Sequence, residues 1–226
     1  MRVRAGSAVT RISRHKQVRV TTADGFEGTF DHLVLAADLK GALGYLDVDA
    51  DERDLFSKVV HQPYYTVTSF LTLPWLATGS VYYLGEHQAP AAGRRHMATD
   101  AGRATAGCPT ILLKPNRGSN LTISWAYGGE GIGAPQMEAC LRETVHRMGG
   151  RFGGVYFVKP WTDYFPHVPA HELRSNFHQR LDALQGRRHT FMVGELFNLP
   201  LVSECVDWAR YLIRRHFGQR PSSAHG

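Results

Sequence analysis

The feature that most constrains the fold is a series of short β-prone stretches between residues 64 and 128. β-branched and aromatic residues favour strands, and short strands that follow one another closely favour antiparallel pairing. We therefore expect an antiparallel sheet with aromatic side chains on one face. The Gly/Ala/Arg-rich residues 89–107 are expected to form a long loop. The four stretches are "YYTVTSFLTL" (64–73), "GSVYYLG" (79–85), "TILLKP" (110–115) and "NLTISWAYG" (120–128).

Three further β-prone stretches precede this sheet, namely "RVRAGSAVTRIS" (2–13), "QVRVTTADG" (17–25) and "FDHLVLAAD" (30–38). We expect them to form a small meander. The third contains a continuous apolar run, which is typical of a strand covered on both faces. Residues 38–59 then predict a helix that is partly exposed.

Helices and strands alternate in the second half of the chain. Residues 134–150, "APQMEACLRETVHRMGG", predict a helix that begins near a proline and ends at a glycine pair. Residues 154–168 predict a strand followed by an extended segment. "TFMVGE" (190–195) predicts a short buried strand, and residues 200–217 predict an amphipathic helix. Its expected apolar face consists of Cys205, Trp208, Ala209, Leu212 and Ile213.

Composition and charge exclude several classes of protein. The 226 residues are 43% hydrophobic, which is enough for a core in one or two domains. The 26 Lys and Arg residues exceed the 20 Asp and Glu residues but are scattered, so we expect no nucleic-acid partner. No apolar run approaches the roughly 18 residues of a membrane span, and no signal peptide is recognisable. We expect a cytoplasmic protein.

Cysteines and histidines give no clear site. Cys108, Cys140 and Cys205 are far apart and form no CxxC motif, so we expect three reduced thiols without zinc or a disulfide. The stretch "HVPAHE" (167–172) offers His167, His171 and Glu172, but a metal site needs three convergent ligands with a suitable second shell, so we expect no metal. There is no GxSxG motif and no local Cys-His signature, so nucleophilic catalysis is not indicated.

The order of these stretches resembles the flavin-containing amine oxidase superfamily. Its strand beside the FAD adenine and its return into the dinucleotide domain are similar to "AVTRIS", "VRVTTADG" and "FDHLVLAAD". Its tryptophan-containing stretch and its closing strand-loop-helix are similar to "PWTDYFPHV" and "FMVGELFNLPLVSECVDWARYLIRRHF". Within that superfamily, these stretches are most similar in sequence to the subgroup that includes polyunsaturated fatty acid isomerase and cyclopiazonate-type oxidocyclases. The resemblance extends from Val3 to Phe217.

This resemblance implies residues that contact FAD. Val9 would contact the adenine through its backbone, and Ala36 would lie beside the diphosphate. Gly194 and Glu195 would contact the ribitol and the diphosphate, and the Val202 N–H would contact the flavin pyrimidine. The family usually has an acidic residue next, whereas this chain has Ser203 followed by Glu204.

The resemblance also implies a hydrophobic substrate pocket lined by aromatic residues, namely Tyr65, Tyr83, Trp125, Trp161 and Tyr164. Other aromatic residues of the same stretches are candidates as well, among them Tyr64, Phe70, Tyr82, Tyr127 and Phe165. Such a lining suits a lipid, polyene or terpenoid-like ligand better than a small charged amine. His167, Asp163 and Tyr164 are the candidates for acid–base catalysis.

One family feature does not occur in this sequence. The family opens with a strand, a GxGxxG turn and a helix whose N-terminus binds the pyrophosphate. The one glycine cluster, "GGEGIG" (128–133), has the wrong spacing and no βαβ unit around it. We therefore expect FAD to be bound weakly, if at all, by these residues alone.

Together these observations predict an α/β (α+β) fold with an antiparallel or mixed substrate sheet beside the remnant of a Rossmann-like FAD-binding domain. The expected parts are residues 1–60, part of the FAD-binding domain; 61–160, the substrate domain; 161–217, a strand-loop-helix that returns to the FAD-binding domain; and 218–226, a disordered tail.

The leading functional hypothesis is a truncated flavin oxidoreductase that acts on a hydrophobic small molecule. One alternative is a flavin-free relative that acts as a cyclase or isomerase, or that binds a hydrophobic ligand. Another is a homo-oligomer, or a subunit completed by a partner chain that carries GxGxxG.

Overall fold

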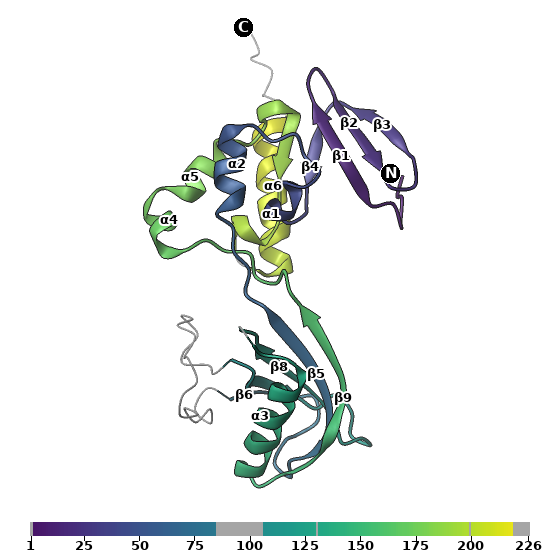
Figure 1. The fold of residues 1–226 in the computed structure, drawn as a ribbon, viewed down its shortest axis with the longest axis vertical. Coiled ribbons are helices and arrows are strands. Elements are labelled where there is room, and N and C mark those ends of the chain that lie inside the picture. Colours follow the sequence, from purple (N-terminus) through teal and green to yellow (C-terminus); the bar gives the residue numbers. More distant parts are fainter. Residues whose placement is uncertain (1, 85–105, 130, 199, 219–226) are drawn as a thin grey trace, which may run out of the picture. The chain divides into compact units, whose positions relative to one another are not determined.

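The computed structural model describes residues 2–84, 106–129, 131–198 and 200–218 (Figure 1). The expected loop at 89–107 and the expected tail at 218–226 lie almost entirely outside these residues. The chain divides into two compact units. The first unit consists of Met1–Val60 and Phe165–Gly226, and the second unit consists of His61–Tyr164.

The second unit is a five-stranded antiparallel sheet in the order β6-β7-β8-β5-β9. The strands are β5 (Tyr64–Thr72), β6 (Val81–Tyr83), β7 (Pro109–Leu113), β8 (Leu121–Tyr127) and β9 (Arg151–Trp161). Helix α3 (Ala134–Arg147) covers one face of this sheet, as Figure 1 shows. Alternate strand residues and the apolar side of α3 form the core, which includes Val67, Leu71, Leu112, Met137, Leu141 and Val145. The predicted antiparallel sheet and the helix from residue 134 are therefore confirmed.

The first unit contains two small sheets. Strands β1 (Val9–Arg14), β2 (Val18–Thr22) and β3 (Glu27–Phe30) form an antiparallel meander. Strands β4 (Leu33–Leu35) and β10 (Thr190–Met192) form a parallel pair. The core shared by this unit includes Ile12, Val18, Leu35, Phe56, Phe177 and Met192.

Helices complete the first unit. They are α1 (Leu39–Ala42), α2 (Ala50–Ser57), α4 (Ala170–Arg174), α5 (Phe177–Asp182) and α6 (Val202–Phe217), with the 3₁₀ turns η1 (Arg187–His189) and η2 (Glu195–Phe197). No helix in the described part of the chain has the length and apolar character needed to cross a membrane.

Two predictions for this unit are wrong in detail. The third strand of the meander is β3, and the "FDHLVLAAD" stretch instead supplies β4. That strand is not covered on both faces, since Val34 is 60% exposed. The single helix expected over 38–59 is two helices. Asp49 starts the second one, because its side chain accepts from the Glu52 N–H while the Glu52 side chain accepts from the Asp49 N–H.

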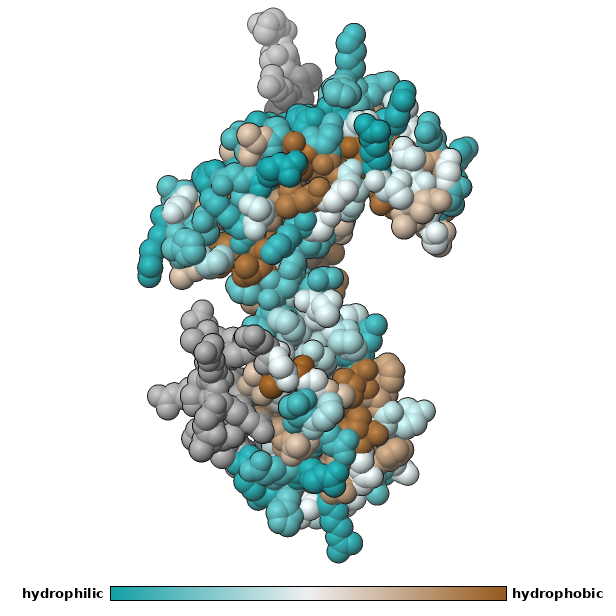
Figure 2. All heavy atoms as spheres, in the orientation of Figure 1, coloured by the Kyte–Doolittle hydropathy of each residue, from teal (hydrophilic) through white to brown (hydrophobic). Residues whose placement is uncertain are grey.

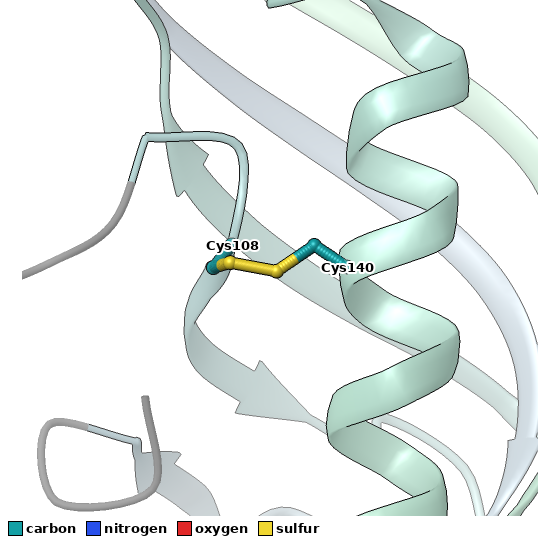
Figure 3. Close-up of a disulfide and its surroundings, with 2 residues drawn as sticks. All are labelled: Cys108 and Cys140. Atoms are coloured by element: carbon teal, nitrogen blue, oxygen red, sulfur yellow. A yellow bond between two sulfur atoms is a disulfide. The ribbon is translucent and has the colours of Figure 1, made fainter. Parts of the chain in front are cut away.

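The expectation of three reduced cysteines is also wrong. Cys108 and Cys140 form a disulfide between the start of β7 and the middle of α3, with their Cα atoms 5.2 Å apart (Figure 3). Cys205 is a free thiol. The 32-residue separation has no motif. The pairing depends on where α3 packs on the sheet, and the spacing of the cysteines along the sequence does not predict that position.

A buried arginine joins distant segments of the first unit. The Arg14 side chain is fully buried, and its Nε lies 2.7 Å from an Asp47 oxygen. Its Nη2 lies 2.7 Å from a Glu52 oxygen, and its Nη1 donates to Thr190 Oγ1 at 3.0 Å. Arg188 also contacts Asp47, at 2.8 Å. Burial alone would lower the pKa of Arg14, but the bonds to Glu52 and Asp47 outweigh it and raise the pKa above its usual value.

The disulfide fixes how many reactive thiols we expect before and after reduction. The unfolded, unreduced protein should expose one reactive thiol per chain, and the reduced protein should expose three. Reduction should lower the free energy of unfolding of the second unit by about 3 to 4 kcal/mol, because the bridge closes a loop of this length in the unfolded chain. The Cys205→Ser variant should show no thiol before reduction. Three thiols in the unreduced wild-type protein would contradict the bridge.

The Arg14 cluster predicts a large cost for removing one buried partner. Glu52→Gln should lower the free energy of unfolding by about 3 to 5 kcal/mol, because the buried Arg14 charge loses a carboxylate. Urea denaturation measures this difference. Asp54→Asn is the matched control, since the Asp54 carboxylate pairs with Arg180 at the exposed surface and its loss should change little. Equal effects of the two variants would contradict the role given to the cluster.

Candidate functional site

The carboxyl ends of β4 and β10 form one edge of the first unit. The two strands are parallel, with Met192 opposite Leu35, and the Val193 N–H donates to the Leu35 carbonyl at 3.0 Å. Ala36 and Gly194 therefore follow the two strands at the same edge. In open α/β sheets, ligands bind at this edge of the strands.

Gly194, which is half-buried, leaves space beside the backbone at this edge. Its φ of 133° lies in a region that other residues rarely adopt, and a Cβ added there would meet no atom within 4 Å. The backbone therefore faces open space that a ligand group could occupy. Glu195, the next residue, is half-buried and begins the turn η2.

Helix α6 begins a few residues after this edge. Phe197 of η2 stacks on Trp208 with ring centroids 5.5 Å apart, and Trp208 Nε1 donates to the Met192 carbonyl at 3.3 Å. The residue before the helix is Leu201, whose side chain cannot cap it, and Val202 is 84% exposed. The first backbone N–H groups of α6 are thus available to an electron-rich group.

These residues fit part of an FAD site. Backbone at Gly194, a half-buried carboxylate at Glu195 and a helix N-terminus at Val202 are suitable partners for ribitol hydroxyls and a flavin oxygen. Val9 belongs to a different sheet, where it pairs with Thr22 of β2. Ala36 is exposed at the end of β4.

The glycine cluster at residues 128–133 serves the second unit's own structure. The Gly128 N–H donates to the Pro63 carbonyl at 2.6 Å, and a Cβ there would lie 2.7 Å from Pro63 and Tyr65. Gly133 precedes α3 and donates its N–H to the Gln136 side chain. The described glycines of this cluster therefore form a tight turn and do not form a pyrophosphate cradle.

The second candidate region is the sheet face of the second unit that α3 does not cover, which we call the open face. Strand alternation and register define its residues, which are Tyr64, Thr66, Thr68, Phe70 and Thr72 of β5, Leu121, Ile123, Trp125 and Tyr127 of β8, Ile111 and Leu113 of β7, Val81 and Tyr83 of β6, and Arg151, Phe157, Lys159 and Trp161 of β9. Several of the aromatic and aliphatic side chains are exposed, including Tyr83, Phe157 and Trp161. Hydrophobic side chains reach the surface of this unit in Figure 2.

A tyrosine cluster lies at one end of the open face. Tyr64 stacks on Tyr164 with ring centroids 4.7 Å apart, and it contacts Tyr127 at 5.2 Å. Next to it, Trp161 Nε1 donates to Thr66 Oγ1 at 3.1 Å. The structure therefore brings together Trp125, Trp161 and Tyr164 from the predicted pocket, and places Tyr83 at the far strand of the same face.

Tyr65 is the exception among the predicted pocket residues. It packs with the core under α3, and its hydroxyl donates to the Ile132 carbonyl at 3.3 Å. Adjacent strand residues point to opposite faces. Tyr65 is therefore on the covered face, and its neighbour Tyr64 is on the open face.

The acid–base candidates fall in different units. Tyr164 and Asp163 belong to the second unit and His167 to the first. The His167 backbone pairs with Val60, and its ring Nδ1 lies 2.9 Å from the Phe165 carbonyl oxygen. In the "HVPAHE" stretch, Glu172 forms an ion pair with Lys58 at 3.0 Å. Across the described residues, no group of three side chains is arranged to hold a metal ion.

We expect the Tyr64 phenol to ionise at a higher pH than an ordinary tyrosine. Burial raises the pKa of this phenol from 10.0 to about 12, although a bond with Thr110 partly opposes the shift. Because the folded pKa exceeds the unfolded one, the free energy of unfolding should fall as the pH rises from about 10 to 12. Ultraviolet titration of phenolate should show a step near pH 12 that Tyr64→Phe removes and Tyr211→Phe retains. A step unchanged in Tyr64→Phe would refute the assignment.

Comparison with known proteins identifies the fold. No protein-family profile and no curated protein sequence matches the chain. A CLA-producing fatty acid isomerase from P. acnes matches in structure with a TM-score of 0.73 and 22% identity, over 93% of this chain and 47% of that enzyme. Putrescine oxidase matches with a TM-score of 0.57 and 9% identity, over 92% and 47% of the two chains.

UDP-galactopyranose mutase matches with a TM-score of 0.56 and 9% identity, over 79% of this chain and 38% of that one. The chain thus spans less than half the length of these enzymes. Its α/β fold is that of FAD-dependent, amine oxidase-like enzymes, and the predicted resemblance to the flavin-containing amine oxidase superfamily is confirmed as a shared fold.

Proposed function

We propose that this chain forms the substrate-binding sheet and the C-terminal part of the FAD-binding domain of an amine oxidase-like flavoenzyme. The observation that carries the proposal is the open face, where Tyr64, Trp125 and Trp161 line a sheet surface that α3, the helix of the same unit, leaves uncovered. Such a surface suits a hydrophobic small molecule. The similarity to an enzyme named as a fatty acid isomerase supports a substrate with a long apolar chain.

The first unit would hold the cofactor. Gly194 and Glu195 would contact the ribitol and diphosphate, Ala36 would lie beside the diphosphate, Val202 would donate to the flavin ring, and Val9 would contact the adenine. Bound FAD supplies an acceptor for a hydride from a C–H or C–N bond of the substrate. The chain's own part is to bind and orient the two molecules.

A polypeptide with a GxGxxG turn would complete this cofactor site, either within a longer chain, in a second chain or in a homo-oligomer. The parallel pair β4 and β10 favours such an addition, because parallel sheets are normally larger and covered on both faces. Val34 of β4 is 60% exposed, and on α6 Val206 and Ile213 are 42% and 59% exposed. These apolar side chains would pack against the added unit.

The second candidate is a flavin-free relative that acts as a cyclase or isomerase, or that binds a hydrophobic ligand. One observation favours it: the described glycines of residues 128–133 form a turn, so this cluster would not bind the pyrophosphate of FAD. The open face needs no flavin to bind an apolar molecule. In this alternative His167, Asp163 or Tyr164 would transfer protons.

A cytoplasmic location stays a prediction. The Cys108–Cys140 disulfide weighs against it, because thiols in the cytosol of most organisms are kept reduced.

The proposal predicts saturable binding of FAD that depends on Gly194. Titration should quench FAD fluorescence, and Gly194→Ala should weaken binding about tenfold, because a Cβ would occupy the space beside the backbone and strain it. Gly25→Ala is the matched control, since Gly25 also has a positive φ and open space around it. An apolar ligand that binds a folded protein unable to quench FAD would favour the flavin-free alternative.

A further inference from the structure

Lys159 interrupts the apolar character of the open face. Among the described open-face residues it is one of two charged side chains, and the other, Arg151, lies opposite Thr72 at the other end of β9. Its Nζ lies 5.2 Å from the centre of the Trp161 ring, and both residues belong to β9. The ammonium group is exposed and sits at one side of an aromatic surface.

Lys159 also heads a row of side chains that crosses the whole sheet. In register, Lys159 of β9 lies opposite Thr66 of β5, and Thr66 lies opposite Trp125 of β8. Trp125 pairs with Ile111 of β7, which pairs with Tyr83 of β6. Four strand spacings give the row a length of about 19 Å. This length is on the scale of a long acyl chain.

The row is polar at one end and apolar beyond it. Thr66 Oγ1 accepts a bond from Trp161, and its own hydroxyl hydrogen can be donated to an anion beside Lys159. Trp125, Ile111 and Tyr83 follow without a charged group. A molecule that complements this order has a small anionic head and an extended apolar tail.

We propose that Lys159 binds the carboxylate of a long-chain acid whose hydrocarbon tail lies across Trp125, Ile111 and Tyr83. This inference rests on the proposed function, because it assigns polarity and direction to a hydrophobic ligand on the same face. Lys159 and Thr66 supply the charge-assisted and neutral hydrogen bonds to the head group. The aromatic row supplies the apolar contact and sets the direction of the chain.

The test compares two ligands that differ only at the head. Dodecanoate and 1-dodecanol are titrated into the full chain, below their aggregation limits, by calorimetry and tryptophan fluorescence. Wild type should bind the acid more tightly than the alcohol. Lys159→Gln should weaken the binding of dodecanoate about tenfold and leave the binding of the alcohol unchanged. Lys159→Arg should retain most of the preference for the acid.

Lys114→Gln is the control for a general loss of surface charge, because Lys114 follows β7 and is not in the open face. It should not alter the acid–alcohol difference. Equal binding of both ligands by wild type and by Lys159→Gln would overturn the role of Lys159 while leaving the apolar site intact. Failure of the folded protein to bind either ligand would overturn the proposed function along with this inference.

Discussion

The first unit depends on the buried Arg14 side chain. Arg14 lies on β1 and reaches Asp47, Glu52 and Thr190, and the last of these is 176 residues away in sequence. A buried guanidinium must be fully paired to offset the loss of its hydration, so these segments have to meet at one place. The cluster therefore holds the start of β10 against the N-terminal half of the unit. The position of Gly194, just beyond β10, follows from that constraint.

The local elements could be predicted to different degrees from the sequence. The open-face sheet could be predicted because its β-branched and aromatic residues alternate, and α3 could be predicted from its apolar spacing and its first-turn proline. By contrast, β3, "EGTF", has only two β-prone residues, Thr29 and Phe30, and its strand is defined by its pairing with β2. The Cys108–Cys140 bridge depends likewise on where α3 lies.

The candidate sites show the same division. Gly194 and Glu195 could be recognised because a glycine after a buried strand is a local signal, but their position beside Ala36 comes from the parallel pairing of β4 and β10. Tyr64 and Tyr65 are indistinguishable by residue type. Register alone places one on the open face and the other under α3, because a shift of one residue exchanges the faces of a strand. Lys159 alternates with Trp161 along β9, and this spacing is a local signal that places the two side chains on one face.

The two faces of the second unit's sheet have separate tasks. Under α3, close packing and the disulfide hold the sheet together, so a change of volume there costs stability. On the open face, side chains such as Tyr83 and Lys159 support little core packing. Substitutions there can alter which ligand is preferred while the sheet stays folded. This separation makes the charge at Lys159 a determinant of ligand choice with little influence on the fold.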